Sequence, residues 1–144
     1  MTTRRQGYAH GTSVPVDRSK QQIESLLTKH GAEGFHTGWQ AATPDDPGWD
    51  AVEFLWKTRT IRFKLARPRV SGYRPNQTAI EQKNRQRWRV LHLVIKAKLE
   101  AVDAGVAIFE EEFLPFIVTG DGRTVAEHLV PRLTGGGQLL LAAP

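Results

Sequence analysis

The chain has 144 residues, a length that fits one domain with its own hydrophobic core. Hydrophobic residues at 40% and charged residues at 24% argue against disorder, and the absence of cysteine excludes disulfides, thiolate metal sites and cysteine nucleophiles. No stretch approaches the roughly 18 apolar residues of a membrane span and no apolar run follows Arg4 and Arg5, so we expect a cytoplasmic protein, neither secreted nor membrane-spanning.

The net charge of +5 is unevenly distributed along the chain. Residues 1–56 carry five basic and seven acidic side chains, residues 57–98 carry thirteen basic side chains against Glu81 alone, and residues 99–144 carry two basic and seven acidic ones. A middle block with a net charge of +12 repels itself unless an anion offsets it, so the distribution predicts polyanion binding. The alternative is that acidic residues of the flanking blocks form surface ion pairs with it.

The first predicted element is a helix over residues 18–30, preceded by an arm. Residues 1–13 are rich in Thr, Arg, Gln and Gly without periodicity, which is typical of a flexible basic arm. Asp17 or Ser19 can cap the helix, and Gly31 ends it. Its apolar residues recur at helical spacing and are Ile23, Leu26 and Leu27.

Three strands are predicted next. Alternation over residues 35–39 indicates the first, and the turn-rich segment 43–48 ends it. Residues 52–56 and 61–65 also alternate, with residues 57–59 between them as the turn, which predicts a hairpin. On the polar face Arg62 and Lys64 alternate with the apolar residues and Arg59 and Arg67 flank them, so we expect four cations on one side.

A long helix over residues 79–104 follows, with a capping box from Thr78 to Glu81 and Gly105 as the stop. From Trp88 onward it carries two apolar stripes, which predicts a core helix covered on most sides. The first stripe is Trp88, Leu91, Ile95, Leu99 and Val102, and the second is Val90, Leu93, Val94, Ala97 and Ala101.

The first two turns of this helix are basic. Lys83 and Arg87, like Arg85 and Arg89, are four residues apart, where like charges destabilise a helix by roughly a few tenths of a kcal/mol per pair. These cations also lie near the positive end of the helix dipole. Locally disfavoured residues often mark functional positions, and a bound anion would remove both penalties. The alternative is a solvated basic face.

Beyond Gly105 we expect a short helix over residues 106–114 with Ile108, Phe109 and Phe113 inward. A strand over residues 116–118, a helix capped by Thr124, and a flexible tail over residues 134–144 complete the chain.

Together these elements predict one α+β domain over residues 14–133. Its three-stranded antiparallel sheet packs on the long helix in the order α-β-β-β-α, and short helices follow. Double-stranded RNA-binding domains share this order, but the loops here lack their usual motifs.

No catalytic or metal-ligating motif is present. The five histidines lack HxH or HExxH spacing, and consecutive glutamates at residues 110–112 fan around a helix, so we expect no metal or cofactor. A nuclease site built from Asp50, Glu53 and Lys64 does not match the required pattern, because Arg62 stands where a carboxylate is needed.

The residues expected to contact phosphates are therefore cations of the hairpin and of the helix start. They are Arg59, Arg62, Lys64, Arg67, Lys83, Arg85, Arg87 and Arg89. Trp49 and Tyr73, expected in loops, are the candidates for stacking on bases.

Five segments resemble a family of small uncharacterised phage and prophage proteins, and the likeness covers roughly residues 12–132. The segments are residues 13–20, 85–89, 95–102, 113–115 and 121–125. Members of this family lie among phage genes for DNA recombination and replication. The resemblance therefore implies a role near nucleic acid, DNA more than RNA, in the cytoplasm of a bacterial host. It implies no activity and no site residue.

The leading hypothesis is a non-catalytic nucleic-acid-binding accessory protein of phage DNA metabolism. The alternative is a phage early protein that binds and modulates a host enzyme or defence protein, through the acidic helix near Glu111 or an apolar patch that includes residues 139–141. A metal-dependent nuclease is a third and less favoured hypothesis.

Overall fold

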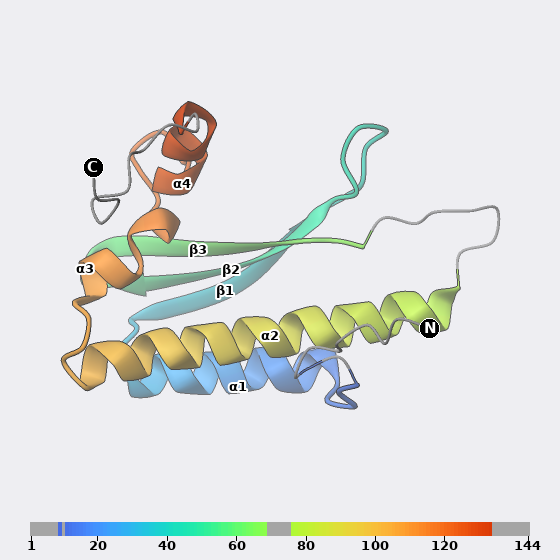
Figure 1. Ribbon diagram of the computed structural model, residues 1–144, viewed down its shortest axis with the longest axis horizontal. Coiled ribbons are helices and arrows are strands. Elements are labelled where there is room, and N and C mark those ends of the chain that lie inside the picture. The colour runs from blue at the N-terminus through green and yellow to red at the C-terminus, as the bar shows by residue number, and fades with distance from the viewer. Residues whose placement is uncertain (1–8, 10, 69–75, 134–144) are drawn as a thin grey trace, which may run out of the picture.

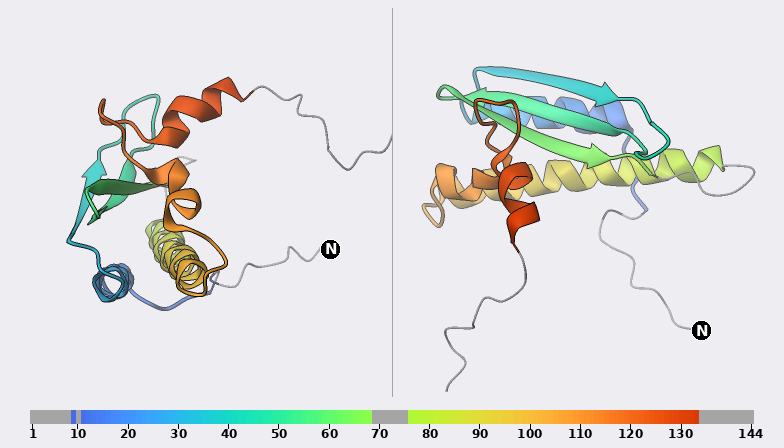
Figure 2. Two further views of the ribbon diagram at one scale, coloured as in Figure 1. Left: turned by 90° about the vertical axis from the view of Figure 1, so that its left-hand side faces the viewer. Right: turned by 90° about the horizontal axis from the view of Figure 1, so that it is seen from above.

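The computed structural model describes residue 9, residues 11–68 and residues 76–133 of the chain. Helices α1 and α2 lie side by side under one face of the sheet, and α4 lies on the other side (Figures 1 and 2). The elements are α1 (Val16–Lys29), β1 (Gly34–Gln40), β2 (Trp49–Trp56), β3 (Arg59–Ala66), α2 (Gln77–Asp103), α3 (Phe109–Glu112), η1 (Leu114–Phe116), α4 (Val125–Leu129) and η2 (Val130–Arg132). The predicted α+β class and element order are confirmed. The expected tail lies outside the described residues, as does most of the expected arm.

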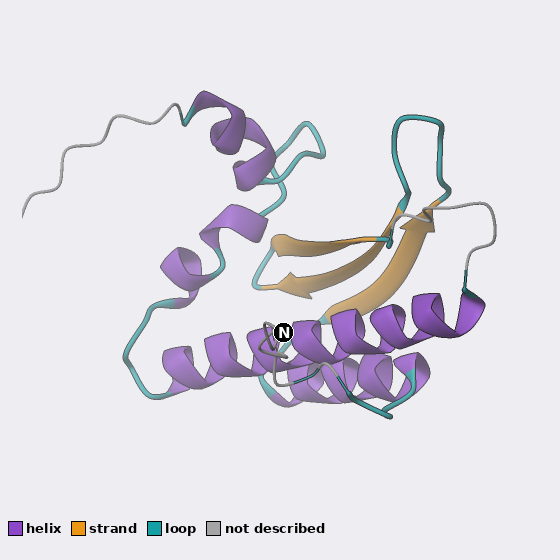
Figure 3. Cartoon of the chain, turned by 45° about the vertical axis from the view of Figure 1, so that its right-hand side comes forward, coloured by secondary structure: helices purple, strands orange, loops and turns teal. Residues whose placement is uncertain are grey.

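The sheet has the order β1-β2-β3, and both pairings are antiparallel. Lys57 and Thr58 alone form the turn between β2 and β3, with φ values of 44° and 69°. Two-residue hairpin turns favour positive φ at both positions, because their twist then matches that of the strands. The predicted turn is confirmed, although Arg59 already belongs to β3. The loop over residues 41–48 extends beyond the sheet at the opposite end (Figure 3).

Helices α1 and α2 run in the same direction. The contacts that show this are Gln82 Nε2 to the Thr12 carbonyl at 3.0 Å, Arg89 to Gln22 Oε1 at 2.7 Å, and His30 to Asp103 at 3.0 Å. In these three pairs the residue numbers increase along the chain for both partners, so the two helices are parallel. The basic start of α2 therefore lies beside the start of α1, under the end of the sheet from which the 41–48 loop leaves (Figure 1).

Helix α2 begins earlier than its predicted start. The Asn76 side chain accepts a hydrogen bond from the Ala79 backbone N–H at 3.3 Å, so Asn76 is the N-cap. The predicted capping box at Thr78 and Glu81 is wrong, because an asparagine just upstream already satisfies a free amide of the first turn. The predicted stop is confirmed, since the helix ends at Asp103 and Gly105 has a φ of 73°.

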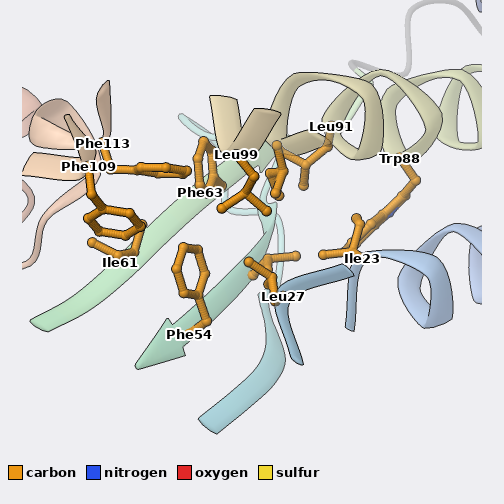
Figure 4. Close-up of a cluster of buried hydrophobic side chains, with 12 residues drawn as sticks. Ile23, Leu27, Phe54, Ile61, Phe63, Trp88, Leu91, Leu99, Phe109 and Phe113 are labelled. Atoms are coloured by element: carbon orange, nitrogen blue, oxygen red, sulfur yellow. The ribbon is translucent and has the colours of Figure 1, made fainter. Parts of the chain in front are cut away.

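The core lies between the sheet, the two long helices and α3 (Figure 4). Of the two stripes predicted on α2, the first supplies the buried residues Trp88, Leu91, Ile95 and Leu99. The prediction that the second stripe is also covered by the core is wrong, because Val90 is 42% and Val94 is 37% exposed. The other buried members of the core are Ile23, Leu27, Val52, Phe54, Ile61, Phe63, Phe109 and Phe113.

The segment after α2 crosses the edge of β3 and continues on the outer face. Ile117 forms an antiparallel bridge with Ile61, and the Val118 N–H donates to the Thr60 carbonyl at 2.9 Å. The predicted strand over residues 116–118 is therefore reduced to single bridges, and the predicted helix over 106–114 is reduced to α3. Ile108, predicted inward, caps α3 and is exposed.

The helix predicted after this crossing is confirmed. Thr124 caps α4 and accepts a hydrogen bond from the Glu127 N–H at 3.2 Å. Among the described residues, no helix is both long enough and apolar enough to cross a membrane.

Candidate nucleic-acid interface

The four cations of the hairpin lie on two faces of the sheet. Successive residues of a strand point to opposite sides, so Arg62 and Lys64 lie on the outer face while the odd-numbered residues of β3 face the helices. Arg59 and Arg67 follow the odd-numbered set, since they pair with side chains of α3 and of the inner face of β2. The expectation that all four share one side is therefore wrong.

Each of these four cations has a carboxylate partner. The pairs are Arg59 with Glu110 at 3.3 Å, Arg62 with Glu53, Lys64 with Glu127 at 3.3 Å, and Arg67 with Asp50 at 3.2 Å. Two of these acids precede residue 57 and two follow residue 98, so the flanking blocks do fold back onto the basic block. Partly exposed pairs of this kind contribute about 0–1 kcal/mol each. Their main consequence is to neutralise the hairpin.

The cations at the start of α2 have no such partners. Within the described chain, Lys83, Arg85, Arg87 and Arg89 make no ion pair with a carboxylate. Arg85 donates to Gln82 Oε1 within the helix, and Arg89 donates to Gln22 Oε1 at 2.7 Å, toward α1. Lys83 and Arg87 lie on the other side of the helix, toward β3. Among the described residues of the basic block, most of the cations without a carboxylate partner therefore lie on α2.

Two hairpin cations and two helix cations line one surface hollow of about 740 Å³, which we call the basic hollow. It lies where β3 ends beside the first half of α2. The four cations are Lys64, Arg67, Lys83 and Arg87. Trp49 and Asp46 also line it, together with Pro47, Gly48, Ala66 and Pro68. The Asp46 carboxylate accepts a hydrogen bond from the Gly48 N–H at 2.7 Å, so this carboxylate already has a hydrogen-bond donor within the loop.

An anion in the basic hollow would relieve the repulsion between two helix cations. Lys83 and Arg87 are one helical turn apart, and like charges at this spacing cost roughly a few tenths of a kcal/mol. They are the seventh and eleventh residues of α2, beyond the first turn in which the helix dipole acts, so the repulsion between the two side chains is the penalty that remains. A phosphate between α2 and β3 would interact favourably with both cations.

Two tryptophans contact cations of the basic hollow, and the sequence predicted only one of them. Trp49 begins β2 instead of lying in a loop, is half-buried, and has Lys64 Nζ 4.6 Å from its ring centroid. Tyr73 lies outside the described residues. Trp39, which was not predicted, is 68% exposed and has the guanidinium carbon of Arg67 5.5 Å from its ring centroid.

His92 lies on the α1 side of α2, partly buried and close to two cations. Its Nδ1 is 3.2 Å from Arg89 Nη1, and because guanidinium only donates, this nitrogen accepts. Burial lowers the pKa of His92, and the charges of Arg89 and Lys96 lower it further. This geometry agrees with a hydrogen-bonded structural role for His92.

The carboxylates considered for a nuclease site do not converge. Asp50 faces inward and pairs with Arg67, whereas Glu53 lies on the outer face with Arg62. Among the described residues, no cluster of three or more His, Asp or Glu side chains could hold a metal ion. The glutamates of residues 110–112 are partly used in ion pairs, through Glu110 with Arg59 and Glu112 with Lys98.

A polar cluster closes the 119–128 turn on the outer face. Thr119 Oγ1 donates to Asp121 Oδ1 at 2.7 Å, and His128 Nε2 lies 3.0 Å from Asp121 Oδ2. The pKa of Asp121 is lowered well below its usual range by the Thr119 hydrogen bond, then by a backbone N–H and His128. The same nitrogen of the His128 imidazole contacts both Thr119 and Asp121, so these three side chains hold the turn closed and do not form a catalytic relay. Within this turn the Gly122 carbonyl accepts a hydrogen bond from Arg62.

No protein-family model, curated protein or solved structure matches the chain. The resemblance to phage proteins stays a prediction.

Proposed function

We propose that the protein is a non-catalytic nucleic-acid-binding protein that holds phosphates in the basic hollow. The observation that supports this most strongly is that one hollow is lined by Lys64 of β3, by Arg67 just after β3, and by Lys83 and Arg87 of α2. The resemblance noted in the sequence adds the setting, an accessory role in phage DNA metabolism with DNA as the main ligand.

Phosphate binding suits this arrangement for physical reasons. Each phosphate that a cation neutralises releases condensed counterions, which supplies most of the sequence-independent affinity for nucleic acid. Lys83 and Arg87 have no carboxylate to displace within the described chain, whereas Lys64 and Arg67 must share their charge with Glu127 and Asp50. The helix cations should therefore contribute more affinity than the strand cations.

The positions of the cations on α2 decide which residues the test should alter. Arg85 and Arg87, adjacent basic positions in the sequence, lie on different sides of α2, so a pair at one hollow is Lys83 and Arg87. We expect the double variant K83E/R87E to bind a fluorescent 12-nucleotide DNA strand at least tenfold more weakly in 50 mM salt.

A matched control changes the net charge equally at the far end of the molecule. Lys29 ends α1 and Lys57 lies in the hairpin turn, and neither lines the basic hollow. We expect K29E/K57E to retain most of the affinity. Equal losses in both variants would mean that total charge, and not the hollow, governs binding.

A second candidate function, binding to a protein partner, is favoured by exposed apolar side chains after α2. Val106 is 83%, Leu133 is 75% and Val130 is 61% exposed. Exposed apolar surface often marks protein interfaces. A pull-down from bacterial lysate treated with nuclease separates the candidates, because a partner that persists under nuclease and is lost with V130D/L133D favours this one.

A further inference from the structure

Trp39 has an exposure that its packing does not explain. At 68% exposed it differs from the other three tryptophans, which are half-buried or buried. It lies near the end of β1, an edge strand of the sheet, opposite Asp50 of β2. Exposing a large indole to water forgoes the burial that aromatic side chains usually provide, so a binding role is a natural explanation.

Arg67 connects this indole to the basic hollow. Its guanidinium carbon is 5.5 Å from the Trp39 ring centroid, while its side chain lines the hollow. Asp50 holds the guanidinium through two contacts, Nε to Oδ2 at 3.3 Å and Nη2 to Oδ1 at 3.2 Å. The Arg67 backbone N–H also donates to the Gly48 carbonyl at 2.9 Å. The position of Arg67 relative to the indole is therefore set by both its main chain and its side chain.

We propose that the basic hollow binds single-stranded nucleic acid, with one base stacked on Trp39 at its rim. This deepens the proposed function and depends on it. Arg67 interacts with the indole by a cation–π contact, and the exposed part of the ring remains accessible to a base. In a duplex the base faces are hidden by stacking and pairing, so this ring can stack only on an unpaired base. The adjacent phosphates then lie within reach of the cations of the hollow.

The test compares single and double strands that contain the same number of nucleotides. The variants are W39A, W39F, the control V106A, which removes an exposed apolar side chain after α2, and K83E/R87E. Dissociation constants for dT12, rU12 and a six-base-pair duplex are measured by fluorescence anisotropy at one salt concentration. Circular dichroism confirms that each variant is folded.

The proposal expects tighter binding of the wild type to dT12 than to the duplex. Stacking contributes roughly 1–3 kcal/mol per base, so W39A should weaken dT12 binding about 5- to 150-fold. W39F should retain much of the affinity, V106A all of it, and duplex binding by W39A should be unchanged. Comparison of dT12 with rU12 shows which strand the site prefers, because both offer unpaired bases.

Several results would overturn the proposal and leave the proposed function standing. An unchanged dT12 affinity in W39A, with a loss in K83E/R87E, would mean that the hollow binds phosphates without stacking. An equal loss for dT12 and duplex in W39A would remove the preference for single strands. A wild-type dimer that W39A converts to a monomer without altering dT12 binding would assign Trp39 to contact between copies. If no oligonucleotide binds, the proposed function itself fails.

Discussion

Glu127 of α4 lies 3.3 Å from Lys64 of β3, so a carboxylate from the end of the domain neutralises a cation at the basic hollow. An incoming phosphate must compete with Glu127 for Lys64. The same applies to Asp50, which holds Arg67.

Replacing Glu127 by Gln should therefore strengthen oligonucleotide binding. A partly exposed pair is worth about 0–1 kcal/mol, which corresponds to an increase in affinity of up to about fivefold. Titration of labelled dT12 with E127Q measures this effect. E111Q, which neutralises an exposed glutamate that has no ion pair in the described chain, serves as the control. A weaker complex in E127Q would show that Glu127 assists binding.

The hairpin turn offers a prediction about stability. Lys57 and Thr58 adopt positive φ values, a conformation that costs a residue with a side chain about 1 kcal/mol or more. The double variant K57N/T58G should raise the free energy of unfolding by about 0.5–1 kcal/mol, because Asn-Gly suits this turn. Urea denaturation measures the change. No gain would mean that contacts of Lys57, which lies over the Trp56 ring, offset the turn strain.

Phe113 tests whether the segment after α2 belongs to the same folding unit. It is fully buried, with its ring edge-on to Phe54 and Phe63 and stacked on Phe109. Truncation to Ala should destabilise the protein by about 3–5 kcal/mol in a single cooperative transition. Unfolding in two steps, with the sheet and long helices unaffected, would separate this segment from the domain.

His92 makes stability depend on pH in the weakly acidic range. Its pKa is lowered in the folded protein by burial, Arg89 and Lys96, so below about pH 6.5 the unfolded chain binds a proton that the folded chain resists. Stability should fall as the pH drops through this value and stop falling below the folded pKa. In H92Q this part of the pH profile of thermal unfolding should be flatter. An identical profile would assign the dependence to other groups.

The elements could be predicted because their signals are local. Alternation defined the hairpin, and glycine defined the end of α2. The start of α2 was misplaced because Asn76 and Thr78 are both good caps and only the structure shows which one is used. The apolar stripe at Val90 and Val94 was misassigned because a sequence shows which residues are apolar, not how many neighbours cover them.

The candidate site could be predicted only in part. The distribution of charge along the sequence identified the cations, but it did not predict that carboxylates neutralise some of them. Glu110 and Glu127 reach β3 from segments more than forty residues away. Trp39 was missed because it continues the alternation of Phe35, and the alternation does not reveal where the core ends. The available signal was an aromatic residue only a few positions before the turn-rich segment 43–48.

The central claim, that Lys83 and Arg87 contact phosphates in the basic hollow, is tested most directly by the salt dependence of binding. The slope of log affinity against log salt concentration for dT12 should become shallower by about 1.4 in K83E/R87E, since each phosphate contact to a single strand contributes about 0.7. The slope of K29E/K57E should match that of the wild type. A slope in K83E/R87E equal to that of the wild type would contradict the account.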